Sequence, residues 1–205
     1  FGLLDVAPGS DSNSNLMIRD TLQRPLGSLR ISVTDRCNLR CHYCMPESDY
    51  QWLDKALILD FDELCRVARA FGGLGADRIR LTGGEPLLRK DLPELVSLLK
   101  RESAFRDIAM TTNGVLLEAH GEALKNAGLD RLTISLDSLD SIRYARLTAR
   151  DKFAEAIRGI ELAGTLGFDS VKINTVVIRG ENEDELVDLL EFGRRVGAEV
   201  RFIEY

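Results

Sequence analysis

Apolar and polar residues alternate in several short stretches of the chain, and each stretch is followed by a longer segment with helical spacing. In the first stretch Ile31 and Val33 alternate with Ser32 and Thr34, as in a strand with two unlike faces. The same alternation recurs five times. It predicts six strands, over residues 29–34, 78–82, 107–112, 131–136, 170–178 and 199–204.

Helical patterns lie between these strands. In one of them Ala156, Ile160 and Ala163 recur at spacings of three and four, which gives a helix one apolar face for packing on a sheet. The predicted helices lie near residues 61–72, 92–101, 120–126, 152–166 and 183–196. Repeated strand and helix units are typical of a parallel sheet. We therefore predict an α/β fold, a partial six-unit (β/α) barrel of the TIM type with parallel strands.

Two segments fall outside this rhythm. Residues 1–16 are rich in small polar residues and lack periodicity, so we expect a disordered tail before a domain over 17–205. A transit peptide would be rich in arginine, and this segment has none. Residues 46–60 mix Trp52, Leu53 and Leu57 with charged neighbours, and we expect them to cover the mouth of the barrel.

Composition narrows the class of protein. With 205 residues and 44% hydrophobic content the chain can bury a full core. No apolar run approaches the ~20 residues of a membrane span. A net charge of -6 gives no general attraction to nucleic acid or to anionic lipid. The few unpaired cysteines indicate a reducing compartment, so we expect a cytoplasmic protein.

Three cysteines follow the first predicted strand: Cys37, Cys41 and Cys44. Their spacing lets the sulfurs face one centre and leaves a fourth metal position open. Inert burial and a disulfide are both poor explanations for three thiols on a polar loop. Structural zinc needs a fourth ligand, and the nearby choices are His42 and Cys65, of which Cys65 fits a helix core. An iron–sulfur cluster with one open iron is favoured.

Three further blocks stand at predicted strand ends, where parallel βα enzymes place their reacting groups. Residues 82–86 read Thr-Gly-Gly-Glu-Pro, in which glycines permit close backbone approach and the acid can accept from an ammonium group. A tight turn with a solvated Glu85 is the alternative. Residues 111–114 and 135–138 supply hydroxyls and amides, which in isolation would satisfy loop backbone groups.

Basic residues within the strands are the remaining signal. Where the alternation turns Arg30, Arg80 and Lys172 inward, they would face the barrel interior. Buried cations need a negative partner, and a triphosphate would supply one that suits the arginine fork. The alternative is that these side chains point outward into ordinary surface salt bridges.

These motifs together resemble a known family. Cys37-x-x-x-Cys41-x-x-Cys44, with Tyr43 before the third cysteine, resembles the signature of radical S-adenosylmethionine enzymes. Over residues 17–205 the chain is similar to the GTP cyclase family that opens molybdenum cofactor biosynthesis. The blocks that carry this similarity occur in the same order, at residues 29–46, 82–87, 111–114 and 135–137.

The resemblance implies a radical S-adenosylmethionine core and a role for each matching residue. It implies a 4Fe-4S cluster on Cys37, Cys41 and Cys44. It implies contacts to S-adenosylmethionine from Tyr43, Gly83, Gly84, Glu85, Asn113 and Ser135. It implies contacts to GTP from Arg30, Arg80, Thr111 and Lys172, with Arg78 and Asn174 as weaker candidates. In the implied reaction a 5′-deoxyadenosyl radical removes a ribose hydrogen from GTP, and the sugar carbon then bonds to carbon 8 of guanine.

The same resemblance implies partners and a longer protein. An external electron donor and a downstream molybdopterin-pathway enzyme are the implied partners, with no nucleic acid and no membrane. A second cysteine trio is also implied, and no cysteine follows Cys65. We therefore expect the N-terminal part of a longer enzyme, poorly able or unable to complete cyclisation alone. The competing hypotheses are a radical enzyme acting on a peptide or RNA, and a non-enzymatic zinc or redox module.

Overall fold

The computed structural model describes residues 18–45, 47 and 49–205, and a single parallel sheet organises them. Its strands follow one another in chain order, and every neighbouring pair is parallel. The strands are β1 (Ser28–Ser32), β2 (Arg78–Thr82), β3 (Asp107–Thr112), β4 (Arg131–Ser135), β5 (Ser170–Val177) and β6 (Glu199–Glu204). Because β1 and β6 stand at opposite edges, the sheet is open, and the predicted partial six-unit barrel is confirmed.

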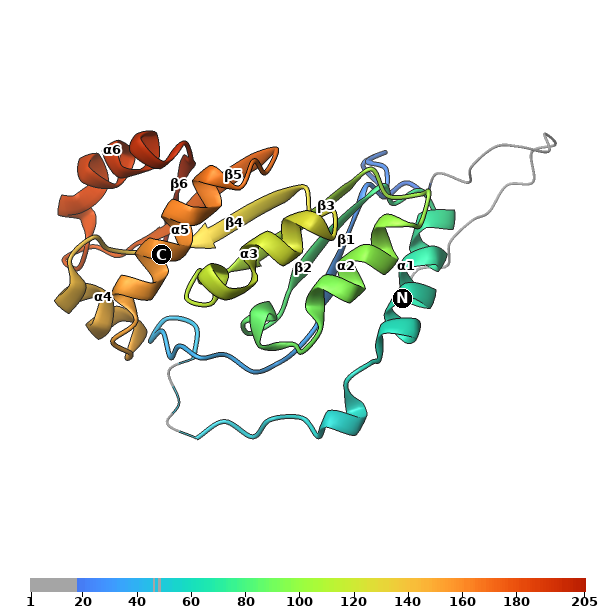
Figure 1. Cartoon of the computed structure of the whole chain (residues 1–205), viewed down its shortest axis with the longest axis horizontal. Helices are drawn as coiled ribbons and strands as arrows, with labels where there is room; N and C mark the ends of the chain where they lie inside the picture. Colours follow the sequence, from blue (N-terminus) through green and yellow to red (C-terminus); the bar gives the residue numbers. More distant parts are fainter. Residues whose placement is uncertain (1–17, 46, 48) are drawn as a thin grey trace.

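The helices lie between consecutive strands, and Figure 1 shows α2, α3 and α5 crossing the same side of the sheet. The residues expected to form a tail, 1–16, lie outside the described part of the chain. The helices are α1 (Phe61–Gly73), α2 (Leu92–Lys100), α3 (Leu117–Asn126), α4 (Ser141–Thr148), α5 (Phe153–Thr165) and α6 (Leu186–Val196), with short 3-10 turns at Lys55–Leu57, Pro86–Leu88 and Glu183–Glu185.

Helix α4 is missing from the sequence prediction. It has eight residues, and its buried side chains include Tyr144 and Leu147 beside exposed Ile142, so its apolar pattern is short and incomplete. Its start is set by Asp140, whose carboxylate accepts from the backbone N–H of Arg143 at 2.7 Å. A cap of this kind can define a helix that periodicity does not reveal.

The two faces of the sheet differ in chemistry. On one face Ile31, Leu81 and Met110 are register neighbours, and they are buried in the core with helix residues. The next row along the strands, on the other face, holds Arg30 beside Arg80. Since side chains alternate along each strand, the apolar set packs under the helices and the charged set lines the concave side.

The first strand ends two residues before its predicted limit. Val33 still donates its N–H to the carbonyl of Thr82 at 2.9 Å, and Gly84 donates to the carbonyl of Thr34 at 2.8 Å. The chain therefore stays attached to β2 beyond Ser32 through turn residues instead of a regular ladder. Among the described residues, no helix is long and apolar enough to cross a membrane.

Gly159 allows α5 to pack closely on the turn after β3, because a Cβ there would lie 2.2 Å from the Gly114 carbonyl oxygen. We expect Gly159→Ala to lower the free energy of unfolding by about 1 to 3 kcal/mol, measured by urea denaturation. Gly73→Ala is the control, because nothing lies within 4 Å of the added Cβ. It should be neutral or stabilising by about 0.5 to 1 kcal/mol. Equal losses in the two variants would contradict this packing argument.

Candidate active site

A cavity of about 250 Å³ lies at the carboxyl ends of the strands and gathers residues from seven segments of the chain. Most of the sequence-predicted site residues line it. Those residues are Cys37, Cys41, Tyr43, Cys44, Gly83, Gly84, Glu85, Thr111, Asn113 and Ser135. Asn174, a weaker candidate for a nucleotide contact, lines it too. The cavity also includes residues that were assigned no role from the sequence, namely Leu39, Thr82, Thr112, Asp137, Tyr144, Thr148, Val176 and Ile203.

The thiols sit on a short turn beside this cavity. Cys37 and Cys41 are half-buried, Cys44 is exposed, and all three are free. The N–H groups of Cys44 and Met45 both donate to the Cys41 carbonyl, at 2.9 and 2.7 Å, which closes the turn. Cys65 is buried in the core of α1, as expected for a packing thiol.

The donor set fits an iron–sulfur cluster. Three thiols border one cavity, and the rest of its wall is formed by Glu85, Asn113 and Ser135 among others, without a fourth cysteine. Thiolates are the usual cluster ligands. Within residues 18–45, 47 and 49–205, no group of three or more His, Cys, Asp or Glu side chains is arranged to hold a single metal ion.

Partial burial favours the protonated form of two of the three thiols, Cys41 and Cys37. Desolvation raises the pKa of Cys41 to about 12, and the nearby Asp137 carboxylate adds to this rise. The pKa of Cys37 is also raised, again mainly by desolvation. Metal binding must therefore displace protons from buried sulfurs.

The Gly-Gly-Glu block lies directly against the cysteine segment. Glu85 donates its N–H to the Arg36 carbonyl at 2.7 Å, one residue before Cys37. A Cβ on Gly84 would lie 2.3 Å from that same carbonyl oxygen. Only glycine permits this backbone approach, so residue 84 fixes the distance between the two segments.

Glu85 is 1% exposed and its carboxylate is held from several directions. It accepts from the N–H of Leu87 at 3.0 Å, from the Thr112 hydroxyl at 2.7 Å and from the N–H of Asn113 at 2.7 Å. Burial raises the pKa of Glu85, and these hydrogen bonds oppose the rise. The result is an oriented carboxylate in the cavity wall that can accept from an ammonium group.

Asn113 connects the third strand to the cysteine segment. Its side-chain amide donates to the Asn38 side-chain oxygen at 2.7 Å. Asn38 is the residue after Cys37. The end of β3 is therefore coupled to the turn that carries the thiols.

The sequence-predicted cations occupy the concave face of the sheet, apart from the thiols. Arg80 is half-buried and donates to the hydroxyls of Thr111 at 3.3 Å and Thr133 at 3.2 Å. Lys172 pairs with Glu199 at 2.8 Å, with its side chain 16% exposed. Arg30 is exposed, but with Arg80 it lines a second cavity of about 140 Å³. Thr111 links this group to the thiol cavity.

The concave face holds further basic residues that were not assigned from the sequence. Arg131 makes a two-point pair with Asp107, and Arg201 bonds to Glu199 at 2.7 Å. In each strand the basic residue stands next to an apolar one, Leu132 or Val200, that points to the opposite face. This alternation was a usable sequence signal, because it places Arg131 and Arg201 on the face of Arg80. Arg78, a weaker candidate, lines the second cavity as well.

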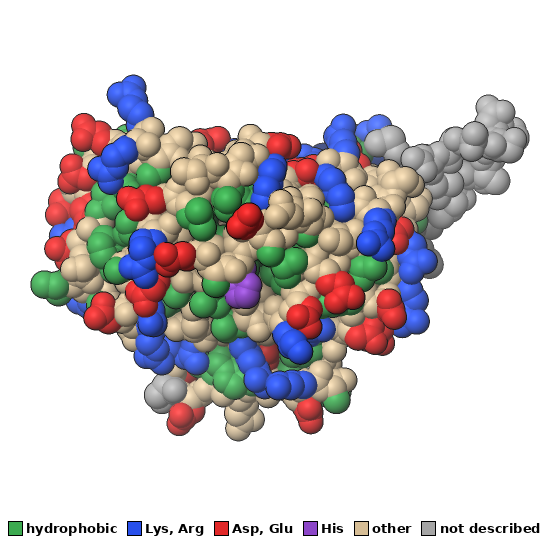
Figure 2. All heavy atoms as spheres, viewed as in Figure 1, with side chains coloured by type: hydrophobic (Ala, Val, Ile, Leu, Met, Phe, Trp, Pro, Cys, Tyr) green, Lys and Arg blue, Asp and Glu red, His purple; other side chains and the backbone are tan. Residues whose placement is uncertain are grey.

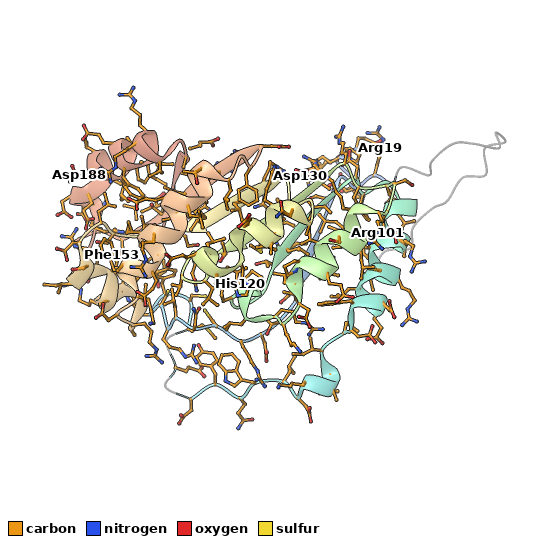
Figure 3. All side chains as sticks on the ribbon, viewed as in Figure 1. Arg19, Arg101, His120, Asp130, Phe153 and Asp188 are labelled. Atoms are coloured by element: carbon orange, nitrogen blue, oxygen red, sulfur yellow. The ribbon has the colours of Figure 1, made fainter. Side chains whose placement is uncertain are left out.

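The helix-covered side shows no comparable separation of charge. Figure 2 shows basic and acidic side chains interspersed over that side. His120 lies there on α3, and it does not line the thiol cavity (Figure 3). Residues 49–60 do not line this cavity, but Leu53 and Leu57 lie against Val33 and Thr34 just after β1, so the expectation that the segment covers the barrel mouth stays a prediction. They also pack beside the cysteine turn, where Arg40 lies 5.1 Å from the Trp52 ring centroid.

The parallel partial barrel and the cysteine turn at its strand ends define a class of enzyme. The Radical SAM superfamily model matches residues 31–193, and the chain belongs to that superfamily. Within it, the chain is 48% identical over 212 residues to GTP 3′,8-cyclase 3 of Mycobacterium tuberculosis, covering 100% of this chain and 56% of that protein. It is 46% identical over 191 residues to GTP 3′,8-cyclase of Aquifex aeolicus, covering 92% and 59%. The chain thus spans about half the length of the curated relatives it matches.

Solved structures share the fold at low sequence identity. SuiB of Streptococcus suis, in a crystal structure with S-adenosylmethionine, has a TM-score of 0.72 and 19% identity over 88% of this chain and 41% of that one. Methylornithine synthase has a TM-score of 0.69 and 18% identity over 87% and 53%. These likenesses support the barrel architecture.

The Lys172 and Glu199 pair should make stability depend on acid. Hydrogen bonds from Lys172 and Arg201 lower the pKa of Glu199 from 4.5 to about 2. A lowered folded-state pKa contributes stability that is full above the unfolded value and is lost as pH falls towards the folded value. We expect wild type to exceed Glu199→Gln in stability at pH 6, with the difference vanishing near pH 2.

Chemical denaturation at a series of pH values would measure this difference. Glu191→Gln, on the exposed side of α6, is the matched control and should show no such pH dependence. If the stability of wild type exceeded that of Glu199→Gln by the same amount at pH 6 and at pH 2, ionised Glu199 would not be the source of the difference.

Proposed function

We propose that this chain is the radical-generating core of a GTP 3′,8-cyclase. The observation that carries the proposal is one cavity walled by three thiols and the Glu85 carboxylate, next to a concave face rich in cations. The similarity to relatives named GTP 3′,8-cyclase supports the choice of substrate. In this proposal residues 17–205 form the radical S-adenosylmethionine domain of a cytoplasmic enzyme.

Cys37, Cys41 and Cys44 would hold a 4Fe-4S cluster with one iron free of protein ligands. When bound, such a cluster supplies one electron for cleavage of S-adenosylmethionine to methionine and a 5′-deoxyadenosyl radical. The protein's own part is to hold the thiols at fixed spacing and to exclude water from the buried side. Cys41 and Cys37 contribute to this because both are half-buried beside the cavity.

The groups opposite the thiols would hold S-adenosylmethionine. Glu85 would accept from its ammonium group, and Gly83 and Gly84 would let the ligand approach the backbone. The hydroxyl of Ser135 and the amide of Asn113 would add polar contacts, and the ring of Tyr43 would lie beside the adenosyl part. All of them line the cavity.

The concave cations would hold the triphosphate of GTP. The face carries Arg30, Arg78, Arg80, Arg131, Lys172 and Arg201 against two acids, Asp107 and Glu199. Basic side chains therefore exceed acidic ones by four (six minus two). This excess positive charge equals in magnitude the negative charge of a fully ionised nucleoside triphosphate. Arg80, Arg30 and Lys172 would contact phosphate oxygens, and Thr111 would position the nucleotide between this face and the thiol cavity.

Further parts of the reaction belong to partners. An external one-electron donor would reduce the cluster, and a downstream molybdopterin-pathway enzyme would take the product. The expectation that cyclisation needs a second cysteine trio beyond this sequence stays a prediction. Neither nucleic acid nor a membrane has a role in the proposal.

Replacement of any cluster thiol should abolish cofactor cleavage. Cys37→Ser, Cys41→Ser and Cys44→Ser each put a hydroxyl where iron requires a soft thiolate. After anaerobic reconstitution we expect about four irons per chain in wild type and a large loss in each variant. Cys65→Ser is the control and should keep iron and 5′-deoxyadenosine formation. Loss of iron in Cys65→Ser with retention in Cys37→Ser would refute the ligand assignment.

Removal of concave cations should weaken nucleotide binding alone. Arg80→Ala and Lys172→Ala should each raise the Kd for GTP about ten- to a hundredfold, since a hydrogen bond to a charged group contributes about 1.5 to 3 kcal/mol. Isothermal titration would measure the change. S-adenosylmethionine binding and iron content should stay near wild type.

Arg66→Ala on α1 is the matched control, because it removes one exposed positive charge from outside the concave face. It should leave the Kd for GTP unchanged. Unaltered affinity in both Arg80→Ala and Lys172→Ala, or an equal loss in Arg66→Ala, would overturn the GTP assignment.

A further inference from the structure

One side chain on the cysteine turn points into the barrel and makes a hydrogen bond to a residue there. The hydroxyl of Tyr43, which stands between Cys41 and Cys44, donates to Asp137 Oδ2 at 2.5 Å. Asp137 lies 94 residues away along the chain, just after β4, and is 3% exposed. This bond therefore joins the thiol turn to the floor of the cavity.

Asp137 is itself held firmly. Its other carboxylate oxygen accepts from the N–H of Val176 at 2.8 Å. Its backbone carbonyl accepts from the side-chain amide of Asn182 at 2.7 Å, and the same amide donates to the Val176 carbonyl at 2.9 Å. Asn182 is fully buried. The carboxylate is thus fixed between β4 and β5 and can serve as an anchor.

The turn has few other attachments near its last thiol. Arg40 donates its N–H to the Thr148 carbonyl at 2.8 Å, and His42 donates to the Leu147 carbonyl at 3.3 Å. Both contacts precede Tyr43. Beyond it, Cys44 bonds only back to the Cys41 carbonyl among the described residues, and its side chain is exposed.

We infer that Asp137 is a positioning residue that acts through the Tyr43 hydroxyl to set the place of the Cys44 thiol relative to Cys41. A short hydrogen bond to a rigid buried carboxyl group fixes the tyrosine in direction as well as distance. With Tyr43 fixed, the backbone on either side of it cannot rotate freely. This inference rests on the proposed function, in which the thiols hold one cluster.

The consequence is measurable as the rate at which a bound cluster loses iron. A thiolate held in place recombines with iron before a chelator can remove the metal, while a thiolate on a loose turn does not. We expect Tyr43→Phe and Asp137→Asn each to speed iron loss to an excess of chelator by roughly tenfold, the order of effect of losing one hydrogen bond. The reconstituted protein would be followed anaerobically by its visible absorbance.

The double variant tests whether the two residues act together. If the residues act through one bond, Tyr43→Phe combined with Asp137→Asn should lose iron no faster than either single variant. Multiplied effects in the double variant would show independent roles and overturn the inference. Tyr50→Phe is the control, since it removes a tyrosine hydroxyl on the neighbouring segment and keeps the ring stacked on Trp52. It should lose iron at the wild-type rate.

A purely structural role gives a different result. If the bond only stabilises the fold, Tyr43→Phe would lower the thermal midpoint of the metal-free protein and leave the rate of iron loss unchanged, which would contradict the inference. Failure of the proposed function is distinguishable, because wild type would then bind little iron or form no 5′-deoxyadenosine. Asp137→Asn keeps the side-chain shape, and Tyr43→Phe keeps the ring, so folding of both variants can be checked by circular dichroism.

Discussion

The backbone contact between the Gly-Gly-Glu block and the cysteine segment is the constraint on which the site depends. Glu85 donates to the carbonyl of Arg36 and Gly84 donates to the carbonyl of Thr34, so the chain after β2 is joined to the chain after β1. This contact sets the distance from the thiols to the buried carboxylate. A side chain at residue 84 would separate them. The cavity exists because two turns without obstructing Cβ atoms can approach each other.

The fold could be predicted from periodicity because the strands alternate apolar and polar residues and the helices between them have regular apolar spacing. Strand residues such as Ile79 and Leu81 alternate with Arg78 and Arg80, and the first pair is buried under the helices. What periodicity could not give was α4, whose start depends on the Asp140 cap. Nor could it place residues 49–60, whose position depends on the stacking of Tyr50, Trp52 and Arg40. Those contacts join segments whose spacing carries no regular pattern.

Most of the site was predictable because its residues stand at strand ends in recognisable blocks. Asp137 shows the limit. It belongs to the same block as Ser135, but its hydrogen bond to Tyr43 could not be read from the sequence, because no spacing rule relates residues 94 positions apart. Arg131 and Arg201 were missed for a different reason. The alternation in their strands carried the signal but was not used, and the strand register shows that each shares a face with Arg80.

The charged interior also explains how stability and function are divided between the two faces of the sheet. A closed barrel fills its interior with bulky apolar side chains and draws stability from them. Here the concave face carries more basic than acidic side chains, and desolvation lowers the pKa of Arg80. The apolar layer under the helices must therefore supply the stability of the fold. The excess positive charge is gathered on one face only in the folded state, so an anionic ligand of the proposed kind would stabilise the protein as it fills the site.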